Sequence, residues 1–222
     1  MLSYPEYAAM LLADGRLPVG GHTQSAGLEP ALLGGLALAD VPDFVATRLR
    51  TVVLVDAAVA VVARHRTWAG LPLQEVQAAW AARTPSHVAR AASVTVGRGQ
   101  RRLAQRLWPG SPAAAVLAPL REPARPVSLG AMAAVAGLDG ARTARLVAYD
   151  DVATLCAAAL KLAPLDPVET TEWLLHADLG VDELVRAVAL LTDPDDIPAP
   201  SAPQLETWLH HHRDHPRRLF SA

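Results

Sequence analysis

Apolar and polar residues along the chain repeat mostly at spacings of three and four positions, which is the period of an amphipathic α-helix. The stretches LQEVQAAWAAR and VDELVRAVALLT follow this period along their whole length. No stretch alternates apolar and polar residues at every second position between hairpin turns, as a half-buried strand would. The β-branched run TVVLV lies inside a longer helical period. The pattern therefore predicts an all-α protein without a sheet.

Prolines and capping residues mark the starts of the predicted helices. Proline tolerates the first turn of a helix because its missing N–H would be unpaired there. Asp40 and Asp166 precede such prolines and can cap the helices that follow. We expect helices over residues 5–14, 25–33, 40–70, 72–83, 85–108, 113–120, 127–138, 141–163, 166–176, 181–192 and 201–212.

These helices predict a single-domain helical bundle of roughly eight to ten helices over residues 1–193. The segment DPDDIPAPSAP that follows is rich in Pro and Asp, which favours an extended connector. We therefore expect residues 194–222 to form a Pro-rich linker and a mobile C-terminal docking tail.

Composition narrows the function classes. The 222 residues carry a net charge of −2, so no long-range field draws the chain to nucleic acid. The longest apolar run, VVLVDAAVAVVA, is interrupted by Asp56 and is shorter than the ~20 residues that a membrane span needs. No signal peptide is evident, and the single Cys156 cannot form an internal disulfide. These features predict a soluble, cytoplasmic protein. Because 51% of the residues are hydrophobic, the chain either exposes apolar interfaces or is an ordinary Ala-rich bundle.

The stretch RLPVGGHTQSAGLE, residues 16–29, departs from the helical pattern. As a plain connector it makes sense, because proline fixes φ, glycine permits positive φ and Ser25 can cap the next helix. This interpretation leaves unexplained the polar residues His22, Thr23 and Gln24 between two apolar helices. A phosphate-binding loop would need a preceding strand and a lysine after the glycines, and both are missing. The remaining hypothesis is a recognition surface for another protein.

Other candidate sites are weaker. The sequence TQSAG imitates a nucleophile elbow only loosely, and Asp150 and Asp151 on one helix point in two directions. In HHHRDH, His211 and His215 are one helical turn apart, but two imidazoles make an incomplete metal site. We therefore assign no catalytic residue, no metal site and no cofactor.

A basic stripe follows the predicted helix over residues 85–108. The three- and four-residue spacings of its arginines place them on one helical face. A solvated face is the default interpretation, and a docking surface for an acidic partner is the functional alternative. Gly97 and Gly99 would let another backbone approach closely beside the stripe. The stripe consists of Arg98, Arg101, Arg102 and Arg106.

The opening loop resembles the N-terminal signature of the urease accessory protein UreF family. Three further stretches in the same order are similar to that family, GRGQRRL, RPVSLGAMAAVAGL and KLAPLDPVETTEWL, and so is the end of the chain, HRDHPRRLFSA. Departures from the family pattern are Gln24, Lys161, Asp166 and Pro167. In the loop, the matching residues are Pro18, Gly20, His22, Ser25, Gly27 and Glu29.

The resemblance implies a non-catalytic, all-helical protein that forms a homodimer. It implies that the chain bridges the scaffold protein UreD, called UreH in some systems, to the GTPase UreG, and couples GTP hydrolysis to nickel loading of apo-urease. The partner-binding residues would be Pro18, Gly20, Gly21, His22, Gln24, Ser25, Gly27, Glu29, Arg98 and Arg102, together with Arg218, Leu219 and Phe220 in the tail. The alternatives are a nickel-binding chaperone that uses His210–His215, an all-α enzyme, or a helical adaptor unrelated to urease.

Overall fold

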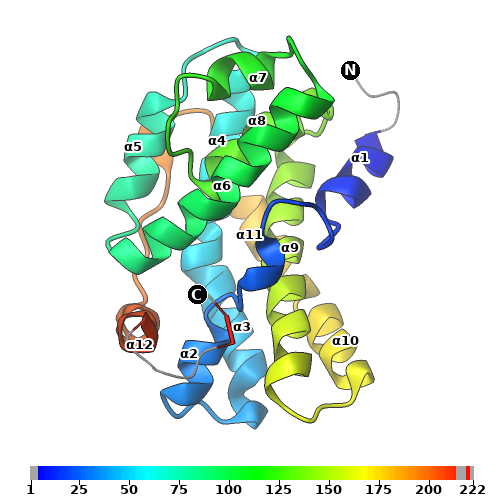
Figure 1. Ribbon diagram of the computed structural model, residues 1–222, viewed down its shortest axis with the longest axis vertical. Helices are drawn as coiled ribbons and strands as arrows, with labels where there is room; N and C mark the ends of the chain where they lie inside the picture. Colours follow the sequence, from blue (N-terminus) through cyan, green and yellow to red (C-terminus); the bar gives the residue numbers. More distant parts are fainter. Residues whose placement is uncertain (1–4, 214–218, 221–222) are drawn as a thin grey trace.

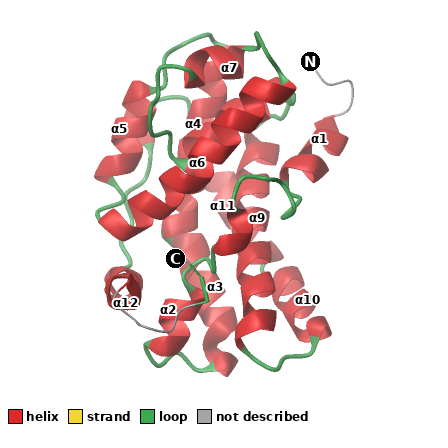
Figure 2. Ribbon diagram, in the orientation of Figure 1, coloured by secondary structure: helices red, strands yellow, loops and turns green. Residues whose placement is uncertain are grey.

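The computed structural model describes residues 5–213 and 219–220, and this part of the chain consists of helices and loops without a strand (Figures 1 and 2). The all-α prediction is confirmed. The helices are α1 (Pro5–Leu12), α2 (Leu28–Leu33), α3 (Val41–Arg50), α4 (Val52–Trp68), α5 (Gln74–Ala82), α6 (His87–Leu107), α7 (Pro112–Leu117), α8 (Arg125–Val135), α9 (Gly140–Leu162), α10 (Pro167–His176), α11 (Asp178–Val188) and α12 (Pro203–Arg213). Short 3-10 helices are η1 (Gly21–Thr23), η2 (Leu38–Asp40) and η3 (Pro194–Asp196).

Helix α4 is the centre of the fold and packs most extensively against α8 and α9. Its residues 57–63 are all buried alanines and valines, as expected of a helix that is apolar around its whole circumference. Small side chains bring the axes close together. A Cβ atom at Gly130 of α8 would lie only 2.2 Å from the carbonyl oxygen of Ala60 in α4. The Ala-rich composition therefore serves close packing in the core.

The single helix expected over residues 40–70 is two helices, α3 and α4, which meet at Thr51. Thr51 has φ −124° and ψ −99°, and its hydroxyl donates a hydrogen bond to the Thr47 carbonyl at 2.7 Å. Such a bond from a threonine to the preceding turn competes with the helical ladder. Beyond the break, α3 packs against α11 as well as α4.

The helix expected to begin at Ser25 begins at Leu28 instead. The two residues before it have left-handed conformations, with φ 52° at Ala26 and φ 76° at Gly27. The Ser25 side chain is buried, and its Oγ accepts a hydrogen bond from the Glu29 N–H at 3.4 Å. The left-handed turn thus shortens α2.

Helix α12 lies against α2, and the last described residues lie near the same place (Figure 1). The ring of Trp208 is 6.2 Å from that of Phe44, and Leu205 is part of the buried core. The boundary between residues 193 and 194 stays a prediction. Among helices in the part of the chain that the structure describes, none has the length and apolar character to cross a bilayer.

Candidate partner-binding surface

The loop between α1 and α2 has a defined shape because it makes its own hydrogen bonds. Gly20 has φ 86°, a conformation that favours glycine, and its carbonyl accepts a hydrogen bond from the Thr23 hydroxyl at 2.8 Å. The Gln24 amide donates to the same hydroxyl at 3.3 Å. Gly21 begins η1 without a positive φ. Of the two adjacent glycines, only Gly20 therefore has a backbone that demands glycine.

This loop lies directly on α6. A Cβ atom at Gly99 would be 2.7 Å from the carbonyl oxygen of Val19 and 2.8 Å from its Cα. Only a glycine at position 99 permits this approach. We expected another backbone to approach α6 beside the arginines. The backbone that does so is the chain's own loop, at Val19. A shallow depression runs along the contact, lined by Pro18, Val19, Gly20, Thr95, Arg98, Gly99, Arg101, Arg102 and Gln105.

The arginines of the stripe have different roles. Arg101 is half-buried, and its guanidinium donates to the carbonyl oxygens of Leu120 and Arg121. Arg98 is exposed and pairs with Glu122, also exposed. Arg102 is exposed and makes no ion pair with the residues that the structure describes. The outer surface beside the loop therefore carries Arg98 and Arg102, while Arg101 holds the segment between α7 and α8.

The structure divides the other candidate residues of the loop into two groups. Pro18 and His22 are exposed, and Gly20, Gly21 and Gln24 are half-buried. Ser25 and Glu29 are buried, and Gly27 lies against Arg48, whose Nη1 would be 3.3 Å from an added Cβ. Only the first group contributes to the outer surface.

The candidate residues at the C-terminus lie partly outside the described residues. Leu219 is 61% exposed, whereas Phe220 is only 5% exposed and is buried against its own chain. Arg218 and His215 lie outside the described residues. In the described residues, no cluster of three or more His, Cys, Asp or Glu is placed to hold a metal ion.

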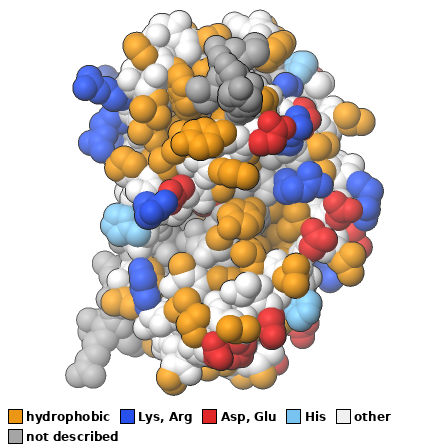
Figure 3. All heavy atoms as spheres, turned by 90° about the vertical axis from the view of Figure 1, so that its right-hand side faces the viewer, with side chains coloured by type: hydrophobic (Ala, Val, Ile, Leu, Met, Phe, Trp, Pro, Cys, Tyr) orange, Lys and Arg blue, Asp and Glu red, His pale blue; other side chains and the backbone are white. Residues whose placement is uncertain are grey.

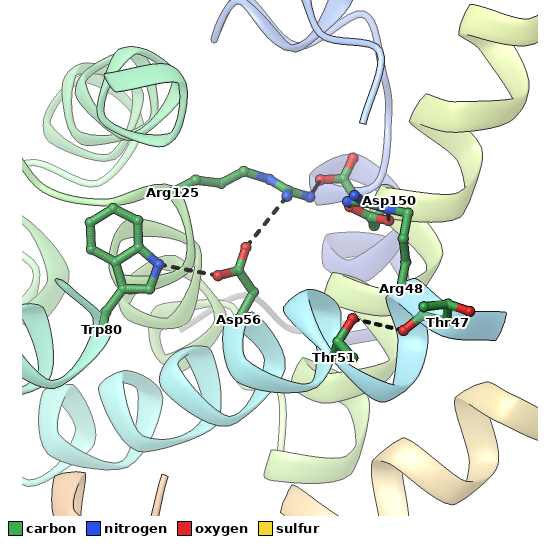
Figure 4. A network of polar contacts seen from close by, with 8 residues as sticks. Thr47, Arg48, Thr51, Asp56, Trp80, Arg125 and Asp150 are labelled. Atoms are coloured by element: carbon green, nitrogen blue, oxygen red, sulfur yellow. Dashed lines mark hydrogen bonds and ion pairs between the residues drawn. The ribbon is translucent and has the colours of Figure 1, made fainter. Parts of the chain in front are cut away.

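Behind the loop is a cavity of about 540 Å³ between α4, α6 and α9. It contains a network of charged residues from four helices, which Figure 4 shows from close by. Arg125, the first residue of α8, pairs with Asp150 of α9 and lies 3.9 Å from Asp56 of α4. Arg48 of α3 binds both carboxylate oxygens of Asp151 at 2.6 and 3.0 Å. The adjacent Asp150 and Asp151 thus do point in two directions, each toward its own arginine.

The network shifts two pKa values. Burial raises the pKa of Asp56 to about 6, although Arg125 and a hydrogen bond from the Trp80 indole at 3.2 Å oppose the shift. Burial disfavours the charge of Arg125, but the carboxylates of Asp150, Asp151 and Asp56 outweigh it and keep the pKa of the guanidinium above its usual value. The ion pairs of the network link α3, α4, α8 and α9, and Asp56 is the member whose carboxyl holds its proton to a higher pH than usual.

Sequence reasoning missed this network. In the sequence Asp56 interrupts an apolar run, and an acidic residue inside a buried helix indicates a buried partner. That signal could have pointed to Asp56. No local pattern indicates that Arg48 and Arg125 are its neighbours, because they come from other helices.

The described residues form an all-helical protein in which an N-terminal loop lies on a basic helix. The sequence model of the UreF family matches residues 37–178. The urease accessory protein UreF of Mycobacterium sp. strain JLS is 36% identical over 215 residues, which cover 96% of this chain and 97% of that protein. Those of Mycobacterium bovis strain BCG / Pasteur 1173P2 and Mycobacterium tuberculosis strain H37Rv are each 35% identical over 214 residues, covering 95% of this chain and 96% of theirs.

The chain belongs to the UreF family of urease accessory proteins. This family is a chaperone-type, non-catalytic one. An accessory protein acts through its contacts with other urease maturation proteins. The resemblance found in the five sequence stretches is therefore confirmed over nearly the full length of the chain.

Proposed function

We propose that the chain bridges the urease-bound scaffold protein UreD, or UreH, to the GTPase UreG, and couples GTP hydrolysis to nickel loading of apo-urease. The proposal also makes the chain a cytoplasmic homodimer. Family membership supports an accessory role, and the contact surface described above supports a role in recognition.

One observation carries the proposal. The loop and the basic helix, which are about 80 residues apart in the sequence, form one continuous surface because Val19 lies on Gly99. On this surface the exposed Pro18 lies in one shallow depression with the exposed Arg98 and Arg102. A rigid loop next to two arginines suits a protein partner that carries carboxylates, because preorganised contacts lose little entropy on binding.

The role of the loop is tested by one disruptive substitution and one control substitution. Gly20→Val forces a β-branched residue to a φ of 86°, so it should deform the loop and weaken binding to the presumed partners. Gly15→Ala is the control, because Gly15 precedes the candidate residues, a Cβ there meets no atom within 4 Å and no positive φ is required. Both variants should keep the helical circular dichroism signal. Wild-type affinity of a folded Gly20→Val variant in pull-down and calorimetry contradicts the proposal.

The tail is tested by deletion. Removal of residues 217–222 should abolish binding to the scaffold protein, because it removes the exposed Leu219 and its neighbours. Unchanged affinity of the truncated chain in calorimetry would count against a docking role for the tail.

The dimer has support from exposed apolar residues. Tyr7 and Met10 of α1, Leu175 of α10 and Leu179 of α11 are each at least 70% exposed. Figure 3 shows hydrophobic side chains spread over the face that includes α1, α9 and α10. Sedimentation equilibrium measures the oligomeric state directly. A monomer at all concentrations up to those used in the binding measurements would refute the dimer.

A further inference from the structure

The carboxylate of Glu29 holds the main chain of the C-terminal tail. Its Oε1 accepts a hydrogen bond from the Leu219 N–H at 2.6 Å, and its Oε2 accepts one from the Phe220 N–H at 2.9 Å. Glu29 is only 5% exposed. Hydrogen bonds to a charged acceptor are stronger than neutral ones, and a buried carboxylate without them is costly. The contact is therefore a strong link between residues 190 positions apart.

The side chains of the two tail residues differ sharply in exposure. Phe220 is 5% exposed and lines the cavity behind the loop, where the Lys161 ammonium lies 5.3 Å from the centre of its ring. Leu219 is 61% exposed. The buried ring anchors the tail, and the hydrogen bonds fix the position from which Leu219 extends outward.

The same glutamate is also attached to the loop. Its own N–H donates to Ser25 Oγ, and the left-handed Gly27 joins the loop to the first turn of α2. His22 and Gln24 of the loop line the same cavity as Phe220. The tail and the loop are thus connected through one buried residue, whose carboxylate holds the tail and whose N–H bonds the loop.

We propose that Glu29 is a latch that joins the C-terminal tail to the N-terminal loop, so that Leu219 and the loop act as one partner-binding unit. Phe220 is a positioning residue in this unit rather than a contact residue, and Leu219 is the contact residue. The inference rests on the proposed function, because the partner is the scaffold protein named there. Both segments bind it in the geometry that the latch sets, and loss of the latch weakens both contacts together.

The experiment compares four variants of the full chain. Glu29→Gln replaces one acceptor oxygen by a donor, and Phe220→Ala removes the anchor. Leu219→Ala removes the exposed contact and leaves the latch intact. Glu206→Gln is the matched control, because Glu206 lines the same cavity and makes no hydrogen bond to Leu219 or Phe220.

Amide hydrogen exchange measured by NMR reports on the latch without any partner. We expect the amides at positions 219 and 220 to be protected in the wild type, in Leu219→Ala and in Glu206→Gln. They should exchange about tenfold faster or more in the other two variants. We expect Glu29→Gln, Phe220→Ala and Leu219→Ala each to weaken scaffold binding about tenfold or more in calorimetry, and Glu206→Gln to bind as the wild type does.

Two results would overturn the latch. Equal amide exchange in the wild type and in both Glu29→Gln and Phe220→Ala would show that Glu29 does not hold the tail. Faster exchange with unchanged affinity would show that the held position has no bearing on binding. A wild-type chain that does not bind the scaffold overturns the proposed function, whereas protected tail amides in that sample still support the link to Glu29. If Glu29→Gln fails to fold, Phe220→Ala decides the question.

Discussion

The contact between the loop and α6 gives a sharp prediction for Gly99→Ala. The added Cβ would lie 2.7 Å from the Val19 carbonyl oxygen, whereas ordinary contacts begin at 3.4 Å, so the loop must move by about 0.7 Å. The atoms that it meets are backbone atoms and cannot rotate away as the end of a side chain could. The loop is held together by its own hydrogen bonds, and we expect it to shift as a unit.

Stability and binding should respond differently to this change. Alanine in a helix interior is favoured over glycine by about 1 kcal/mol, which offsets much of the cost of moving the loop. We therefore expect the free energy of unfolding to change by less than about 1 kcal/mol in urea denaturation. Affinity for the presumed partners should fall about tenfold or more, because the exposed loop residues move relative to Arg98 and Arg102.

Gly180→Ala is the matched control for the helix propensity. Gly180 is in α11, and its added Cβ would meet mainly the Cδ1 end of Leu49, at 3.1 Å. This variant should gain the same helix propensity without moving the loop. Wild-type affinity of Gly99→Ala would refute the reasoning that the position of the loop on α6 matters for recognition. A loss of stability above about 3 kcal/mol would refute the reasoning that the loop moves as a unit.

Three further predictions concern buried groups. The pKa of Asp56 rises from 3.8 to about 6 on folding, so its contribution to stability is present below pH 4 and is lost as the pH rises through 6. Between pH 4 and 8 the wild type should therefore lose about 3 kcal/mol relative to Asp56→Asn in pH-dependent denaturation, and parallel curves would contradict this. Asp151→Ala leaves Arg48, whose side chain is only 12% exposed, without its partner and should cost about 3–5 kcal/mol. The double variant Arg48→Met, Asp151→Leu should recover most of the loss, and equal stability of the two variants would exclude an uncompensated charge as the cause. Burial raises the pKa of the Cys156 thiol to about 11, so at pH 8 it should react with a disulfide reagent on the order of 100-fold more slowly in the native protein than in urea, and equal rates would show that the thiol is accessible.

Local signals in the sequence were sufficient for most of the helices. The cap predicted at Asp166 is present, since its carboxylate accepts a hydrogen bond from the Val168 N–H at 2.9 Å. Ser86 likewise caps α6 near the predicted start of that helix. Asp40, in contrast, makes no side-chain cap bond, because the chain already turns in η2 before α3 begins. The failures occur where a nearby turn or the packing of another helix changes the local preference.

Local sequence features are enough to establish the all-α class, the position of most helices and membership of the UreF family. Helix formation depends on hydrogen bonds between residues four positions apart and on caps at each end, all of which are local. Which distant groups meet depends on how the helices pack in three dimensions. Arg48 and Asp151 are 103 positions apart, and Glu29 and Leu219 are 190 apart. These pairs form because the segments of the chain pack closely. Single glycines such as Gly99 and Gly130 permit that close packing, and no local pattern in the sequence indicates which segments will meet.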